Sequence, residues 1–184
     1  MPDTPIEVRQ LDRAAAEALA PQLCALLQDA VASGGSLGFW RPLGDDYARA
    51  YWRTTITEVD AGERLLLVAL RAGEALGSVQ LALSPKQNAP HRAEVQKLMV
   101  FRTARRQGIG QLLMRAVERL ACDAGRTLLI LDTNTGSDAE RLYAALGYQR
   151  AGVIPRYSVE ADGEERATTL FYKSLETAHG AEQA

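Results

Sequence analysis

The 184-residue sequence has few of the residues that bind metals or form disulfides. It contains two histidines, and its two cysteines, Cys24 and Cys122, fall in separate helical patterns far from any metal-ligand spacing. We therefore expect neither a metal site nor a disulfide framework, and reduced thiols favour a cytoplasmic protein. The longest apolar run, 65–70, is too short to span a bilayer, and the first ten residues do not resemble a signal peptide, so we expect no membrane partner.

An excess of charge of one sign is also missing. The 21 basic and 23 acidic residues give a formal net charge of −2. Such a balance provides no general attraction to nucleic acids, so we expect no nucleic-acid partner and only a local anion site. The 47% content of hydrophobic residues is typical of a globular protein. We expect one domain over residues 1–175 and a disordered tail over residues 176–184.

The spacing of apolar residues predicts an α/β protein in which strands dominate the middle of the chain. Helical periodicity predicts four helices, over residues 12–31, 45–59, 108–124 and 137–146. Alternating or continuous apolar runs predict strands over residues 6–11, 64–70, 75–83, 93–101, 127–132, 148–159 and 168–173. Residues 71–74 predict a tight hairpin connection, and Asp45 is expected to cap the second helix.

The sequence RRQGIG at 105–110 places glycine where the most regular amphipathic helix begins. Free backbone N–H groups and the helix dipole attract anions there, and glycine keeps a Cβ out of the path of a large anion. With Arg105 and Arg106, the segment predicts a phosphate site, although a loop with two solvated arginines is an alternative. A dinucleotide-binding motif would need glycine at Leu113, and a P-loop would need Lys-Ser/Thr after Gly110, so both are excluded.

This Arg-x-x-Gly-x-Gly pattern at a strand-to-helix turn resembles the GNAT N-acetyltransferase superfamily, whose motif holds the pyrophosphate of acetyl-coenzyme A (acetyl-CoA). The resemblance implies a central mixed, mostly antiparallel twisted sheet of six to seven strands, flanked by about four helices. It also implies acetyl-CoA as a co-substrate. The cofactor-binding residues that it implies are Leu98, Met99, Val100, Arg105, Arg106, Gln107, Gly108, Ile109, Gly110, Gln111 and Asn134.

Three further segments, RAEVQKLMV, LDTNTGSDAERLYAALGYQRAGVIPRY and FYKSL, are similar to the tabtoxin resistance acetyltransferase subgroup. Its members acetylate the free amine of a small, amino-acid-like toxin, so the resemblance implies a role in toxin resistance. It also implies that acidic residues at the positions of Glu94 and Asp132 matter for the reaction.

Glu94 is the first candidate to accept a proton from the attacking amine, because an α-amine is mostly protonated at neutral pH. Period-two geometry would place it on one face with Gln96, Leu98 and Val100, unless a bulge intervenes. The alternative for Glu94 is an ion pair with Arg92 or Lys97.

Asp132 ends an apolar strand at the edge where ligands collect in open α/β sheets. It is a candidate to bind the ammonium of the substrate or to help remove its proton. A local turn formed with Thr133 is the alternative. Asn134, two residues later, is a candidate to bind the pantetheine arm or the substrate, and its alternative is a hydrogen bond within the turn.

Tyr143 lies in a helix whose Ser137 and Glu140 match a capping box. The resemblance implies that Tyr143 donates a proton to the departing thiolate. Packing of the ring is the alternative. If the sheet splays near Met99, as the resemblance implies, the N–H of Val100 or Met99 can bind the thioester oxygen.

Phe39, Trp40 and Arg41 follow a glycine-rich segment and are predicted to close over a small amino acid, with Arg41 pairing its carboxylate. A surface loop packed by its own aromatics is the alternative. We expect direct acetyl transfer to the amine of a small amino-acid-like molecule. Acetylation of a protein N-terminus or lysine, a non-catalytic acyl-CoA-binding module, and a homodimer formed through sheet edges remain open.

Overall fold

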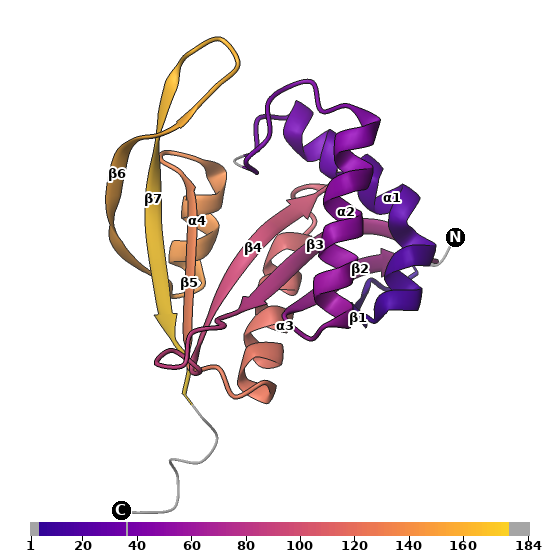
Figure 1. Cartoon of the computed structure of the whole chain (residues 1–184), viewed down its shortest axis with the longest axis horizontal. Helices are drawn as coiled ribbons and strands as arrows, with labels where there is room; N and C mark the ends of the chain where they lie inside the picture. The colour runs from indigo at the N-terminus through magenta and orange to yellow at the C-terminus, as the bar shows by residue number, and fades with distance from the viewer. Residues whose placement is uncertain (1–3, 36, 177–184) are drawn as a thin grey trace, which may run out of the picture.

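The structure is a computed structural model that describes residues 4–35 and 37–176, and its seven strands form one sheet in the order β1-β2-β3-β4-β5-β7-β6 (Figure 1). The strands are β1 (Glu7–Leu11), β2 (Arg64–Arg71), β3 (Glu74–Leu83), β4 (Arg92–Val100), β5 (Leu128–Asn134), β6 (Gln149–Val159) and β7 (Glu165–Ser174). The helices are α1 (Arg13–Ala32), α2 (Asp45–Asp60), α3 (Ile109–Asp123) and α4 (Asp138–Ala145), with a short 3₁₀ helix η1 (Arg102–Ala104). Of the predicted tail, all but Glu176 lies outside the described residues.

Neighbouring strands run antiparallel throughout the sheet except at its centre, where β4 and β5 are parallel. The expectation of a mixed, mostly antiparallel sheet with four flanking helices is therefore confirmed. The elements also occur where the apolar patterns predicted them, with ends that differ by a few residues. No helix in the described ranges combines the length and the apolar character that a bilayer-spanning segment requires.

Two hydrophobic cores lie on opposite faces of the sheet. Helices α1 and α2 cover one face and α3 covers the other (Figure 1). On the first face, Trp52 is 1% exposed and donates a hydrogen bond from Nε1 to the Leu23 carbonyl oxygen, at 2.9 Å, which joins α2 to α1. On the second face, Ile109 and Leu113 of α3 are buried against β2, β3 and β4. The predicted amphipathic face of α3 is thus the inner one.

Two predicted helix caps differ from the structure. Helix α2 begins at Asp45 with Gly44 as its N-cap, so Asp45 lies in the first turn, where its charge favours the helix dipole. Ser137 is the N-cap of α4, but within the described residues its side chain makes no capping bond and lies 3.2 Å from Thr133 Oγ1. Glu140 accepts a hydrogen bond from the Gly136 N–H, one residue earlier than a capping box requires. Among the described residues, neither of the two bonds of the predicted box is formed.

A β-bulge interrupts β4 at Lys97, whose φ is +51°. Gln96, on the α1/α2 face of the sheet, accepts a hydrogen bond from Arg64, and Glu94 shares that face by alternation. Lys97 also points to that face, whereas Leu98 and Val100 pack against the α3 core. The bulge that the prediction named as its exception is therefore present, and Leu98 and Val100 do not share the face of Glu94 and Gln96.

Gly77 of β3 allows β3 and β4 to approach closely beside this bulge. A Cβ at Gly77 would lie 2.5 Å from the Met99 carbonyl oxygen and 3.2 Å from the side chain of Leu113. We predict that Gly77→Ala lowers the free energy of unfolding by about 1–3 kcal/mol, because backbone atoms must shift to admit the methyl group. Urea unfolding monitored by circular dichroism measures this change.

The matched control is Gly152→Ala in β6, where an added Cβ meets no described atom within 4 Å. We expect this variant to keep the stability of the parent protein or to gain slightly, because alanine restricts the unfolded chain more than glycine does. Equal stability of both variants would contradict the close-approach argument.

Candidate active site

The site lies where β4 and β5 separate. The two strands pair over three residues each, Arg92–Glu94 with Leu128–Ile130, and diverge beyond them (Figure 1). A cavity of about 980 Å³ occupies the gap. Its walls come from β4, the end of β5, the turn before α3, the start of α4 and the C-terminal end of α1. The cavity thus lies at the carboxyl ends of the two parallel strands, where ligands collect in open sheets.

The turn before α3 forms one end of the cavity. Gly108 is the N-cap of α3 with φ +78°, a conformation that other residues rarely adopt. Leu112 N–H bonds to the Gly108 carbonyl, so the N–H groups of Ile109, Gly110 and Gln111 precede the first helical hydrogen bond. All three residues line the cavity. The predicted anion-binding end of the helix therefore faces the cavity.

A second constraint, besides the access of an anion to the helix end, favours glycine at position 110. A Cβ at this position would lie 3.3 Å from Leu142 Cδ2 of α4, which is a tight contact. Glycine therefore lets α3 and α4 approach each other closely on one side of the cavity.

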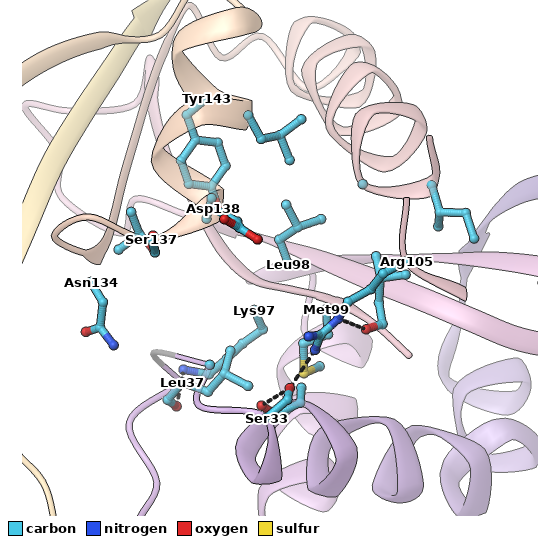
Figure 2. A pocket seen from close by; sticks show the side chains of 18 of the residues that line it. Ser33, Leu37, Lys97, Leu98, Met99, Arg105, Asn134, Ser137, Asp138 and Tyr143 are labelled. Carbon is cyan, nitrogen blue, oxygen red and sulfur yellow. Dashed lines mark hydrogen bonds between the residues drawn. The ribbon is translucent and has the colours of Figure 1, made fainter. Parts of the chain in front are cut away.

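The two arginines of the motif also line the cavity. Arg105 donates from Nε to the Val100 carbonyl oxygen, at 3.2 Å, and from Nη2 to Ser33 Oγ of α1, at 2.5 Å (Figure 2). Arg106 lies in the turn with φ +61°. Gln107, the third predicted residue, does not line the cavity and instead accepts a hydrogen bond from Arg71. The structure brings all the predicted residues of this turn except Gln107 into the cavity wall.

Asp29 of α1 fixes the start of the turn, and the sequence did not single it out. Its carboxylate accepts hydrogen bonds from Arg102 N, at 2.9 Å, and from Arg102 Nε, at 2.8 Å. Burial alone would raise the pKa of the Asp29 carboxyl, but the bonds from Arg102 and the nearby charge of Arg105 hold it below the ordinary value. A residue 73 positions earlier in the chain thus anchors the turn for which anion binding is predicted.

The hydrogen-bond pattern of β4 identifies which backbone N–H faces the gap. Phe101 N–H donates to the Leu76 carbonyl of β3, at 3.0 Å. Because successive residues of a strand direct their N–H groups to opposite sides, the Val100 N–H points away from β3 and toward the gap. The Met99 N–H points toward β3, where Met99 is opposite Ser78. Of the two predicted donors, Val100 is therefore the one in position.

Two predicted carboxylates, Glu94 and Asp132, line the other part of the cavity, as does Asn134. Asp132 Oδ2 accepts a hydrogen bond from Thr168 Oγ1 of β7, at 2.8 Å. Thr168 is 1% exposed, so this donor fixes the carboxylate from within the sheet. Alternation places Asp132 on the face of the sheet opposite to the buried Leu131. Glu94 lies on the same face as Asp132. The two acids thus lie on one face, from neighbouring strands.

Tyr143 of α4 reaches the cavity from the opposite face. The residue is 6% exposed and packs against Tyr148 and Phe171, with ring centroids 5.8 and 6.0 Å apart. Burial, together with the charge of Asp132, raises the pKa of the Tyr143 phenol above its ordinary value. The phenol therefore keeps its proton at neutral pH. Tyr143 both packs and lines the cavity, so its two predicted roles are compatible.

Lys97 also lines the cavity. From the sequence we expected it only as a possible ion-pair partner of Glu94. Its ammonium donates to the Leu37 carbonyl oxygen, at 2.9 Å, and lies 5.8 and 5.9 Å from the ring centroids of Phe39 and Tyr51. Burial lowers the pKa of the Lys97 ammonium, and Arg64 adds to this effect, while the two carboxylates partly oppose it. Its placement depends on the bulge, which no sequence motif marks.

Phe39, Trp40 and Arg41 do not line the cavity. Phe39 packs edge-on against Tyr51 of α2, at a ring-centroid distance of 5.4 Å. Trp40 is 66% exposed and donates from Nε1 to the Val159 carbonyl, and Arg41 pairs with Glu160 at 3.6 Å. Trp40 and Arg41 thus connect the segment after α1 to the β6–β7 hairpin. The predicted contact of all three residues with a substrate stays a prediction.

Leu98 and Met99, the remaining predicted cofactor residues, both line the cavity. Figure 2 shows Leu98 and Lys97 pointing in different directions from the same strand. In the described ranges, no group of three or more histidine, cysteine, aspartate or glutamate side chains is arranged to hold a metal ion.

Comparison with solved structures supports the fold. An N-acetyltransferase from Staphylococcus aureus Mu50 superposes with a TM-score of 0.78 at 16% identity, over 94% of this chain and 99% of the other. The acetyltransferase yncA from Salmonella typhimurium, solved with its cofactor acetyl-CoA, superposes with a TM-score of 0.73 at 18% identity, over 98% of this chain and 99% of the other. At such low identity these similarities show a shared fold.

Comparison of sequences gives the family. An uncharacterized N-acetyltransferase from the hisH-hisA intergenic region of Azospirillum brasilense is 32% identical over 112 residues, which cover 60% of this chain and 65% of that protein. The match thus spans slightly less than two thirds of the relative's length. The model of the acetyltransferase (GNAT) family matches residues 27–148, which include the cavity walls of β4, β5 and α3. Because this match covers more than half of the sequence, the chain belongs to the GNAT acetyltransferase family.

Proposed function

We propose that the protein transfers an acetyl group from acetyl-CoA to the primary amine of a small, amino-acid-like molecule, including amine-bearing toxins of the kind that the sequence resemblance implies. The observation that carries the proposal is the gap between β4 and β5, which has an anion-binding helix end at one side and two carboxylates at the other. Family membership supports the reaction class, and the residues at the two ends support the substrates.

The residues of the anion-binding end fit acetyl-CoA. The N-terminal amides of α3 and the Arg105 guanidinium are suited to a pyrophosphate, and the cavity volume of about 980 Å³ suits a long, thin cofactor arm. The exposed backbone of β4 beyond the bulge offers the polar groups of an unpaired strand edge to that arm. The solved complex of the structurally similar yncA with acetyl-CoA supports the same choice. When bound, acetyl-CoA supplies the acetyl group as a thioester.

The groups that line the cavity can carry the required proton transfers. Glu94 or Asp132 accepts the one proton that the amine loses as its nitrogen bonds to the acetyl carbon. The Val100 N–H donates to the acetyl oxygen as negative charge develops there. Tyr143 holds a proton for the sulfur when the carbon–sulfur bond breaks. The products are an amide and a thiol, and no covalent bond to the protein is needed.

Exposed apolar side chains near the acceptor side favour a second candidate substrate, a peptide. Tyr157 and Val159 of β6 are 53% and 51% exposed, and Trp40 bonds to the Val159 carbonyl. The charge of Asp132, together with slight burial and the charge of Glu94, raises the pKa of the Tyr157 phenol. Such a surface is suited to contact residues that follow an acceptor amine in a peptide.

We predict that the protein releases free thiol from acetyl-CoA in the presence of free amino acids and small amine-bearing toxins, and more slowly with peptides. A thiol-reactive dye measures release across the amine panel. A higher kcat/KM with peptides would support the second candidate. Tight acetyl-CoA binding without thiol release from any amine would contradict the proposed activity.

Removing the proton acceptors should lower kcat. We predict that Glu94→Gln together with Asp132→Asn lowers kcat by about 10²- to 10⁴-fold, and that Tyr143→Phe, which keeps the ring, lowers it by about 10²-fold. The effect of Tyr143→Phe is smaller because the thiolate of CoA is a weak base and can leave with little help from a proton donor. Unchanged kcat in folded variants would exclude these residues from catalysis.

Substitutions in the anion-binding turn should change KM for acetyl-CoA more than kcat. We predict that Arg105→Ala raises KM for acetyl-CoA by about 10-fold or more, as expected for a lost charge-assisted hydrogen bond. Asp29→Asn should also raise this KM, because it weakens the hold on Arg102. Arg119→Ala removes a charge from the exposed side of α3 and serves as the matched control. Equal effects of Arg105→Ala and Arg119→Ala would show that the loss of charge alone matters.

A further inference from the structure

An ammonium group shares one face of the cavity with the two carboxylates. Lys97, Glu94 and Asp132 all line the cavity, and all three point to the same face of the sheet. We propose that the Lys97 ammonium binds a carboxylate of the acceptor, so that the acceptors are amines that also carry a carboxylate. This inference rests on the proposed acetyl transfer and names the class of its acceptor.

Two unfavourable free-energy terms act on Lys97 in this position. The bulge gives Lys97 a positive φ, which is unfavourable for a residue with a Cβ. Burial also disfavours its charge, and the nearby Arg64 guanidinium adds repulsion. Costs of this kind persist where surrounding structure enforces them, and they concentrate at functional sites. The position of Lys97 is therefore more than a by-product of packing.

The contacts of Lys97 orient it without neutralising it. The Leu37 carbonyl accepts one of the three ammonium protons, at 2.9 Å, and the rings of Phe39 and Tyr51 lie on other sides. Among the described residues, the ion pairs include none between Lys97 and Glu94 or Asp132, although the charges of both carboxylates act on it. A desolvated charge is costly unless it is paired, so an anionic group of the ligand would stabilise it.

Arg64 and Arg41, the two other cations considered as carboxylate anchors, are already paired. Arg64 bonds to Glu58 and to the side-chain oxygens of Gln80 and Gln96. Arg41, which the sequence suggested as the carboxylate anchor, pairs with Glu160 and does not line the cavity. Lys97 is thus the better-placed anchor. The face then presents negative charge to the ammonium of an amino acid and positive charge to its carboxylate.

Matched acceptors that differ only in the carboxylate test this assignment. Thiol release is measured for a set of L-amino acids and for their primary amides, with the parent protein, Lys97→Met and Lys97→Arg. We expect Lys97→Met to raise KM for the amino acids by about 10- to 100-fold and to change KM for the amides by no more than about twofold. Lys97→Arg keeps the charge and should recover part of the loss. Comparing each acceptor between proteins cancels the different basicities of the amines.

Two control variants accompany these measurements. Lys86→Met removes an exposed lysine from the β3–β4 connection and should leave both acceptor classes unchanged. Arg41→Met tests the rival anchor, and a loss specific to amino acids in this variant but not in Lys97→Met would overturn the assignment. Thermal melting checks that each variant folds. Lys97→Gln, which keeps a donor for the Leu37 carbonyl, replaces Lys97→Met if the latter is unfolded.

The remaining outcomes separate this inference from the proposed activity. Equal loss of kcat with amino acids and amides would mean that Lys97 acts in proton transfer or in folding, and would overturn the inference while the acetyl transfer stands. If no amine is acetylated, the proposed activity fails, and calorimetric titration of the amino acids into the protein saturated with CoA still tests Lys97. Equal affinity of the parent protein and Lys97→Met for amino acids in that titration would refute the carboxylate anchor.

Discussion

Three residue pairs hold β4 to β5, and the separation of the two strands beyond them determines where the functional groups lie. A sheet that stayed paired would use the backbone of β4 on both sides and leave no space at its centre. The bulge at Lys97 and the absence of a side chain at Gly77 let β4 turn away while it remains bonded to β3. The gap therefore arises in the interior of the sheet, between strands that contribute residues to the hydrophobic cores.

The anion-binding turn depends on a helix from the opposite face of the sheet. Asp29 and Ser33, near the end of α1, bind Arg102 and Arg105, while α3 is fixed by its own buried face. The turn is thus held from both sides, although its sequence contains glycine. Burial of Trp52 between α1 and the sheet contributes to the same arrangement, because it sets the position of α1.

Much of the fold could be predicted from the sequence, because strands and helices in this chain carry clear apolar periods. The motif at 105–110 and the carboxylates at strand ends could also be predicted, since both follow from local backbone geometry. The role of Lys97 could not, because a bulge depends on how β4 registers with β3 and leaves no local signal. Asp29 was missed for a similar reason: its partner Arg102 is distant in sequence and becomes a neighbour only in the folded chain.

The cavity is lined from both faces of the sheet, with Glu94 and Asp132 on one face and Tyr143 on the other. Under the proposed chemistry, the proton that the amine gives up is accepted on one face of the sheet, and the proton that the thiol receives is donated from the other face. The two sides are not independent, because they share one cavity and the charge of Asp132 raises the pKa of the Tyr143 phenol. In the proposed reaction, the gap in the sheet would let the amine and the thioester of acetyl-CoA meet between β4 and β5, with the proton acceptors and the proton donor on different faces of the sheet.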